Sequence, residues 1–311
     1  MRAALIVALA LALLAVATFV GPSIEGPHAD FVLWQLRVPR VLAGAVVGGT
    51  LGLVGAVFQA LFRNGLATPD TVGTTAGATL GALASLALGG ASRALPLPAL
   101  TATAFVGALA ASVIVAVVAA SGRARMQDVL LAGIAVTLAA SALATGLQLT
   151  ADVPVLLAAA QWSLGHLPQV GYRGLLTVLP LAAISAFSLL LQTRALQAMA
   201  IGEELAHAQG VDVRRVRAVA LGVGSLGVAA CVAWCGPIAF VGLIVPHLVR
   251  LAVGSALRVV LPLSLVLGAS FLVACDALAR VILQNRELPV GVVTAALGAP
   301  ALVVLIARQR A

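Results

Sequence analysis

The chain has 311 residues, of which 62% are hydrophobic and only 9% are charged, with a mean hydropathy of +1.15. A soluble domain carries about a quarter of charged residues to cover its surface, so this composition excludes a soluble domain and predicts a membrane protein. The net charge of +8 comes from arginines scattered between apolar segments, which argues against a nucleic-acid partner, and the lack of any lysine excludes the usual phosphate-binding loop of an ATPase.

About ten apolar segments follow one another, and each approaches the roughly 20 residues that cross a bilayer as a helix. The first, residues 3–20, is longer than the apolar part of a typical signal peptide, so we expect an uncleaved helix. The other predicted spans are residues 41–62, 72–90, 99–120, 129–149, 172–192, 217–235, 237–253, 260–281 and 290–307. We therefore expect residues 1–311 to form a single all-α transmembrane domain of about ten helices.

The arginines predict how these helices are oriented. Ten spans place both termini on one side, and with Arg2 inside, 12 of the 18 arginines lie on that side and 6 on the other. Membrane proteins carry the excess of basic residues in their cytoplasmic segments. The sequence therefore predicts a multi-pass protein with both termini in the cytoplasm.

The predicted span 41–62 has a stripe of small residues at Gly44, Gly48 and Gly52, spaced four apart. Such a stripe lets another helix approach closely. Gln59 lies on the same stripe, and we expect its amide to bond to a neighbouring helix. This span is therefore predicted to lie inside the bundle.

Cysteine and histidine residues give no pattern of a metal site, and no cofactor is expected. The three cysteines lie within apolar segments, where thiols pack as small hydrophobic residues; they are Cys231, Cys235 and Cys275. His247 is predicted to pack at a helix end. His28 and His166 are predicted on the outer side, where they would matter only if the cargo were haem.

A series of motifs then runs in order through most of the chain, from about residue 34 to 306. They are residues 37–40 (RVPR), 55–73, 131–134 (LAGI), 162–165 (WSLG), 201–211, 236–250 and 288–300. Together they resemble the iron-siderophore, haem and cobalamin permease family, the type II ABC importers. One departure is Gly65, which stands where the family usually has proline, so that this turn is freer than in the family.

The resemblance implies how such a protein works. It implies the permease subunit of a bacterial inner-membrane importer, not an enzyme, that moves a bulky metal chelate, with an iron-siderophore expected and haem or cobalamin as alternatives. It further implies a second copy of the chain, two ATPase subunits on the cytoplasmic side and an extracytoplasmic substrate-binding protein. Spans two to five and seven to ten would form an inverted pseudo-repeat.

The connection 193–217 is the longest predicted cytoplasmic segment and is the candidate contact for the ATPase. Acidic residues 203 and 204 suit the first turn of a short helix, Gly210 suits its C-terminal cap, and Asp212 suits the N-cap of the next helix. The alternative is a solvated loop that meets lipid headgroups through its arginines. The candidate coupling residues are Gly202, Glu203, Glu204, Leu205, Ala206, Gly210 and Val211.

Arg37 and Arg40 are predicted on one face of a helix start at the outer side. The resemblance implies that they dock the binding protein, together with Arg280, by pairing with its carboxylates. At an outer helix start we expect the fold to tolerate reversal of both charges. For Arg280 the alternative is an ion pair with Asp276, four residues earlier on the same helix.

Candidates for the translocation path come from three places. Small and hydroxyl residues follow a predicted inner turn at Thr74, Thr75 and Gly77, and a polar pair follows at Gln127 and Asp128. The predicted outer mouth contains Trp162 and Gly165.

Two other classes of membrane protein are weighed against an importer. A proton-coupled transporter should have unpaired acids deep in the membrane, and only Asp276 comes close, with Arg280 as a ready partner. An intramembrane hydrolase should have a recognisable catalytic motif, and neither H-E-x-x-H nor G-x-S-x-G occurs.

Overall fold

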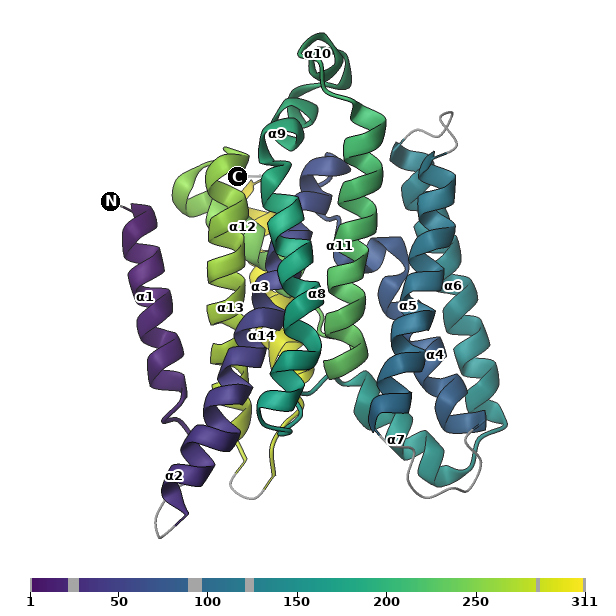
Figure 1. Cartoon of the computed structure of the whole chain (residues 1–311), viewed down its shortest axis with the longest axis vertical. Coiled ribbons are helices and arrows are strands. Elements are labelled where there is room, and N and C mark those ends of the chain that lie inside the picture. Colours follow the sequence, from purple (N-terminus) through teal and green to yellow (C-terminus); the bar gives the residue numbers. More distant parts are fainter. Residues whose placement is uncertain (1, 22–27, 89–96, 121–125, 284–285, 310–311) are drawn as a thin grey trace.

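The computed structural model describes residues 2–21, 28–88, 97–120, 126–283 and 286–309, and the regular structure in these ranges is helical. Figure 1 shows the long helices running roughly side by side as a bundle. The helices are α1 (Arg2–Ala17), α2 (Ala29–Phe31), the π-helical segment η1 (Val32–Arg37), α3 (Val38–Leu61), the 3₁₀ turn η2 (Pro69–Val72), α4 (Thr74–Leu88), α5 (Leu97–Ala120), α6 (Met126–Leu149), α7 (Val153–Ser163), α8 (Tyr172–Leu191), α9 (Thr193–Ile201), α10 (Glu203–Ala208), α11 (Val213–Cys235), α12 (Val241–Val253), α13 (Leu257–Val281) and α14 (Val290–Gln309).

Each of the predicted spans overlaps one of these helices. Six helical segments among the described residues are long and apolar enough to cross a membrane. They are Ala29–Leu61, Ala99–Ala119, Met126–Leu149, Tyr172–Leu191, Val213–Cys235 and Leu257–Val281. The sequence did not predict α7, which lies at one end of the bundle (Figure 1).

The start of α1 and the end of α14 lie on the same side of the bundle. Figure 1 shows α1 beginning and α14 ending toward the end that carries α9 and α10. Following the predicted orientation, we call this the inner end and the opposite one the outer end. This placement agrees with an even number of crossings.

The two halves of the chain repeat one arrangement. In each half a long helix is followed by a short one and then by two longer ones: α3, α4, α5 and α6, and then α11, α12, α13 and α14. Their contacts correspond as well, because α3 packs on α13 as α11 packs on α5, and α3 packs on α12 as α11 packs on α4. This arrangement agrees with the inverted pseudo-repeat that the family resemblance implied for spans two to five and seven to ten.

Helix α3 is the centre of the bundle, as its small-residue stripe predicted. A Cβ atom added at Gly48 would lie 2.3 Å from the carbonyl oxygen of Gly268 on α13, so the two backbones touch. The Gln59 side chain is buried, and its Nε2 donates to the carbonyl oxygens of Gly242 and Leu243 on α12, each at 3.2 Å. The predicted bond from Gln59 to another helix is confirmed.

The start of this helix was predicted wrongly. Helical structure begins at Ala29 and continues through η1 into α3, so Arg37 and Arg40 lie well inside a continuous helix. Pro39 is a typical first-turn residue, which is why the sequence pattern places a start there. Pro39 has no N–H to donate to the preceding turn. The chain is nevertheless helical before it, in the π-helical turns of residues 32–37.

Candidate functional site

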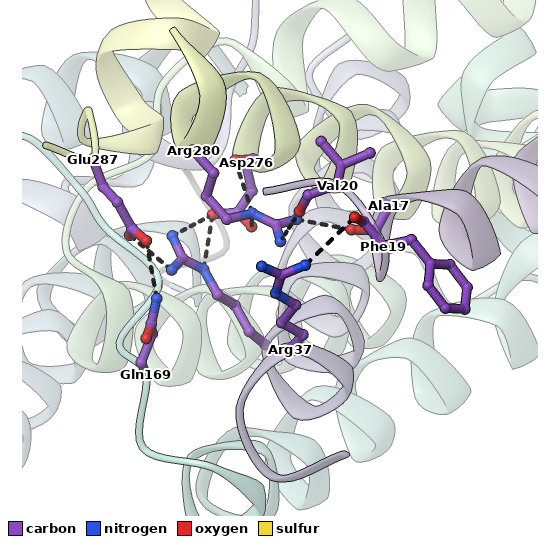
Figure 2. Close-up of polar contacts among 9 residues, drawn as sticks. Ala17, Phe19, Val20, Arg37, Gln169, Asp276, Arg280 and Glu287 are labelled. Atoms are coloured by element: carbon purple, nitrogen blue, oxygen red, sulfur yellow. Dashed lines mark hydrogen bonds and ion pairs between the residues drawn. The ribbon is translucent and has the colours of Figure 1, made fainter. Parts of the chain in front are cut away.

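A cluster of charged residues, which we call the outer cluster, joins α3 to α13 at the outer end (Figure 2). Arg40 donates from Nε and Nη2 to Oδ1 of Asp276, at 3.1 and 2.8 Å. Its Nη1 donates to Oε2 of Glu287 at 2.8 Å, and the other oxygen of that carboxylate accepts from Nε2 of Gln169 at 3.0 Å. Arg40 is only 6% exposed and Asp276 only 1%. The guanidinium is therefore held on two sides by carboxylates.

Arg280 belongs to the same cluster and ties in the first helix. Its Nε lies 3.2 Å from Oδ2 of Asp276, and the side chain is buried. Its Nη1 and Nη2 donate to the carbonyl oxygens of Val20 and Ala17, at 2.8 and 3.1 Å. Because the carbonyl end of a helix is electronegative, a cation there is stabilising. Figure 2 shows Arg280 lying between Asp276 and the end of α1.

Arg37 lies at the edge of the outer cluster. Its Nη1 donates to the carbonyl oxygen of Phe19 at 3.4 Å, and the residue is partly exposed. Its guanidinium approaches the end of α1 beside that of Arg280, as Figure 2 shows. Of the three arginines assigned to docking, only Arg37 therefore has a side chain near the surface.

These positions change the expectation for charge reversal. Arg40 and Arg280 are buried and paired with Asp276, so the alternative kept open for Arg280 is present in the structure. A glutamate at position 40 would be buried beside Asp276 and Glu287, and like charges in such a place are strongly unfavourable. The expectation that the fold tolerates reversal of both Arg37 and Arg40 is wrong for Arg40. It rested on a helix start that the structure does not have.

At the inner end, the connection 193–217 forms a compact helical element. Glu203 and Glu204 occupy the first turn of α10, and Gly210 ends it with φ +76°. The N–H of Gly210 donates to the carbonyl of His207 at 2.9 Å, and that of Val211 donates to the carbonyl of Ala206 at 3.0 Å. This pair of bonds is a Schellman cap, which glycine favours because it adopts positive φ without strain. The predicted caps are confirmed.

The same element is fixed to its neighbours. The Asp212 side chain accepts from the N–H of Arg215 at 3.0 Å and caps α11. Nη2 of Arg217 pairs with Oε1 of Glu203 at 2.8 Å, which joins α11 to α10. Nη2 of Arg63, just beyond α3, donates to the carbonyl of Met199 on α9 at 2.9 Å. Helix α10 is therefore connected to the core helix α3 through α9, so that a displacement of α10 would also displace α9 and the end of α3.

The candidates near the start of α4 lie inside the bundle and not at its inner end. The η2 turn packs against α6 at Gly133, where an added Cβ would lie 1.9 Å from the carbonyl oxygen of Thr71. Gln127 is six residues earlier on α6, which at about 1.5 Å per residue is roughly 9 Å along the helix axis. The first and second groups of path candidates are therefore at different depths.

The individual side chains differ in exposure. Thr74 is fully buried and bonds with Ser112 on α5 at 3.0 Å, and Gly77 lies in a close contact between α4 and α5. Thr75 is partly exposed and donates to Asp70. Gln127 and Asp128 are exposed at the start of α6. Among these candidates, only Thr75, Gln127 and Asp128 have side chains that could face a path.

Trp162 and Gly165 lie in a packed junction at the outer end. Trp162 is 6% exposed, and a Cβ added at Gly165 would lie 2.2 Å from the carbonyl oxygen of Pro237. The N–H of Gly291 donates to the carbonyl of Gly165 at 3.3 Å, so the end of α7, the α11–α12 connection and the start of α14 meet here. Both residues join helices in this conformation.

Two features of the structure were not predicted from the sequence. Glu287 was not assigned a role, because its link to Arg40 joins residues far apart in the chain. A pocket at the inner end between α3, α9, α12 and α13 was not predicted either, although Arg63 and Arg250, which line it, are among the 12 arginines predicted on the cytoplasmic side. Two inner arginines near helix ends were the available signal for this pocket.

Comparisons with known proteins give a consistent result. The model of the FecCD transport family matches residues 3–308. The chain is 39% identical over 273 residues to the cobalamin import system permease protein BtuC of Halobacterium salinarum. This alignment covers 88% of this chain and 72% of that protein. It is 37% identical over 282 residues to the hemin transport system permease protein HmuU of Yersinia pestis, with 89% and 84% covered.

A solved structure agrees in three dimensions. It is an inward-facing conformation of a metal-chelate type ABC transporter, and it superposes with a TM-score of 0.87 at 27% sequence identity. The match covers 98% of this chain and 99% of that one. The whole bundle, and not only a part of it, therefore has the architecture of that transporter.

Proposed function

The chain belongs to the FecCD transport family, whose relatives include permeases of metal-chelate ABC importers, and we propose that it moves a bulky iron-siderophore across a bacterial inner membrane, driven by ATP hydrolysis on separate subunits. The observation that carries this proposal is the capped α9–α10 element at one end of the bundle, joined to α3 through Arg63. A permease without a nucleotide site needs such an element to receive force from an ATPase.

Contact with the ATPase is assigned to the face of α10. Glu204 and Leu205 are exposed on this short helix, while Ala206 is fully buried. Gly202 and Gly210 bound the helix, and Glu203 is tied to α11. In this proposal, Glu204 and Leu205 touch the partner, whereas the remaining coupling residues hold α10 in position.

The outer cluster is the proposed docking place of the binding protein. Arg37, Arg40 and Arg280 carry three positive charges against the two negative charges of Asp276 and Glu287, which leaves a net charge of +1. Arg37 lies nearest the surface and would pair first with a carboxylate of the partner. Arg40 and Arg280 are buried, so they would not touch the partner directly. They would hold the helices on which Arg37 lies and add to the positive charge of the cluster.

The path and the second copy belong to the same proposal. Thr75, Gln127 and Asp128 are the path candidates whose side chains are not buried in helix contacts. Helix α6 presents exposed apolar residues, including Leu131 and Leu138, which a second copy of the chain would cover. In this proposal the cargo passes between the two copies, and both termini are cytoplasmic.

The cargo is proposed from likeness and not from geometry. The named relatives have cobalamin and hemin in their names, and the proposal of an iron-siderophore follows the motif resemblance described above. A proton-coupled transporter is less well supported, because the buried Asp276 is paired with two arginines and is not free to exchange protons.

Reconstitution tests the proposal. The chain in vesicles should take up ferric siderophore only when an ATPase subunit, a loaded binding protein and ATP are all present. ATP-driven uptake by the chain alone, or uptake driven by a proton gradient without an ATPase, would refute it. The ligand that the partner binding protein retains on purification then identifies the cargo.

A further inference from the structure

A pocket at the inner end, which we call the inner pocket, has a chemistry that importing a chelate does not use. It lies between the end of α3, the end of α9, the last turns of α12 and the start of α13, and its volume is about 620 Å³. Arg63, His247 and Arg250 line it, and no acidic residue does so within the described part of the chain. The inner pocket is therefore cationic and open to an anion.

Hydrogen bonds hold its two guanidinium groups in place while leaving donors available. Nη1 of Arg250 donates to Oε1 of the buried Gln59 at 2.5 Å. Nε and Nη2 of Arg63 donate to the carbonyl of Met199, at 3.2 and 2.9 Å. Neither arginine forms an ion pair with any described residue. Each thus has N–H groups that only a ligand or water can satisfy.

One part of the wall of the inner pocket is apolar. Ala200, Ile201, Leu251 and Leu257 line it beside the cations, and the neutral polar residues Gln59, Gln197 and Ser255 complete it. Arg63 lies two residues beyond Leu61, where the apolar segment of α3 ends, so we expect the pocket near the level of the lipid headgroups. A site that combines guanidinium groups with apolar walls at this level suits a ligand that is anionic at one end and apolar at the other.

From this geometry we infer that the inner pocket binds the phosphate headgroup of an anionic phospholipid from the adjacent leaflet. Arginine suits phosphate because its planar group offers several donors, and the apolar walls accommodate the glycerol and the first part of an acyl chain. The lipid would bridge α9 and α12, since Arg63 is bonded to the first and Arg250 lies on the second.

The departure at residue 65 fits this assignment. A Cβ atom added at Gly65 would lie 3.2 Å from Nε2 of His247, in the wall of the inner pocket. A proline ring at this position would narrow the pocket further. Glycine thus leaves room for the ligand where the family's usual residue would occupy it.

Native mass spectrometry of the purified chain tests the inference with phosphatidylglycerol and phosphatidylcholine of equal chain length. The wild type should retain phosphatidylglycerol selectively, and the double variant Arg63→Gln/Arg250→Gln should retain it roughly 10- to 30-fold less, as expected when two cations near an anionic lipid are removed. Arg258→Gln, an exposed arginine at the same end outside the inner pocket, is the matched control and should retain lipid normally.

Further variants separate lipid binding from a folding defect. Arg63→Lys/Arg250→Lys keeps both charges and should retain more lipid than the glutamine pair, whereas Gly65→Pro should reduce retention with both arginines intact. Equal retention of the two lipids by the wild type, or unchanged selectivity in the glutamine variant, would overturn the inference.

Other anions give distinct results. Inorganic phosphate should not displace the lipid at millimolar concentration; if it did, the ligand would be a free anion and the lipid assignment would be wrong. If the glutamine variant kept its lipid but lost binding of the ATPase subunit, the pocket would receive an acidic side chain of that subunit. Lipid retention is measured without any partner, so its result stands apart from the proposed transport function.

Discussion

Two pairs of arginines, one at each end of the bundle, are held by opposite kinds of partner. At the outer end, Arg40 and Arg280 are buried, and Asp276 lies between them. At the inner end, Arg63 and Arg250 are held by an amide and a backbone carbonyl, which orient them without neutralising them.

The difference shows what the partner of an arginine implies about its role. A buried cation needs a carboxylate, because an uncompensated charge inside a protein is very costly. A cation that is oriented only by neutral acceptors keeps its charge available to a ligand. The outer pair therefore holds helices together, whereas the inner pair is suited to binding.

The largest effect should come from removing the shared carboxylate of the outer cluster. Asp276→Asn leaves two buried guanidinium groups with one fewer negative charge, and breaking such a pair typically costs about 3–5 kcal/mol. We expect a large loss of folded protein after solubilisation, measured as the fraction that survives heating as a monodisperse peak. Asp152→Asn, an exposed acid at the outer end, should change this fraction little; an equal loss in both variants would contradict the comparison.

Charge reversal at Arg37 should separate docking from folding. Arg37→Glu is expected to keep expression and thermal stability near normal but to weaken binding-protein affinity by tenfold or more, since like charges facing each other across an interface can cost several kcal/mol. The loss should be greatest at low salt. Arg286→Glu is the matched control, as another exposed outer arginine.

If Arg37→Glu left affinity unchanged at low salt, the docking assignment would fail. If it abolished folding as Arg40→Glu should, Arg37 would belong to the buried base of the outer cluster and not to its edge.

A smaller effect is expected at the cap of α10. Gly210→Ala places a side chain at φ +76°, which costs about 1–2 kcal/mol. We expect reduced stimulation of the ATPase by the loaded binding protein while the affinity for the binding protein stays normal. Gly222→Ala, inside α11 with nothing within 4 Å of an added Cβ, should be neutral or slightly stabilising.

The smallest effect should follow from breaking the pair between α10 and α11. Glu203→Gln removes an ion pair whose acid is 44% exposed, and partly exposed pairs contribute about 0.2–1 kcal/mol. A shift of at most a few degrees in the midpoint of thermal unfolding is expected. A loss as large as that of Asp276→Asn would show that the inner end, too, depends on charge pairing.

The sequence predicted well those features that depend on residues close together in the chain. The cap at Gly210 and the N-cap at Asp212 follow from local backbone chemistry, and the ranges of the long helices, except for the start of α3, follow from runs of apolar residues. The buried position of Gln59 inside the bundle followed from its place on the small-residue face of one helix. Each of these needs only a few neighbouring residues.

Features that depend on distant residues could not be predicted in this way. The bond between Arg40 and Asp276 joins residues 236 positions apart, and no local pattern specifies which acid an arginine will meet. The helical turns before Pro39 were not predicted for a different reason: a proline is typical of the first turn of a helix, so it indicates a helix start. The inner pocket could not be predicted because most of its lining residues come from four helices, of which α3, α9 and α12 are far apart in the sequence.

The bond from Arg280 to α1 has a consequence for the order of synthesis. Nη2 of Arg280 reaches the carbonyl of Ala17 across 263 positions. At about 5–20 residues per second, the ribosome needs on the order of tens of seconds to make this stretch. Until α13 arrives, α1 can contact only elements made earlier, such as α3, and Arg37 can donate to the carbonyl of Phe19, whereas the carbonyls of Ala17 and Val20 lack the donor that Arg280 later provides. Its exposed leucines, Leu5, Leu9, Leu11 and Leu13, suit a helix that packs against α13 only after most of the chain has been made.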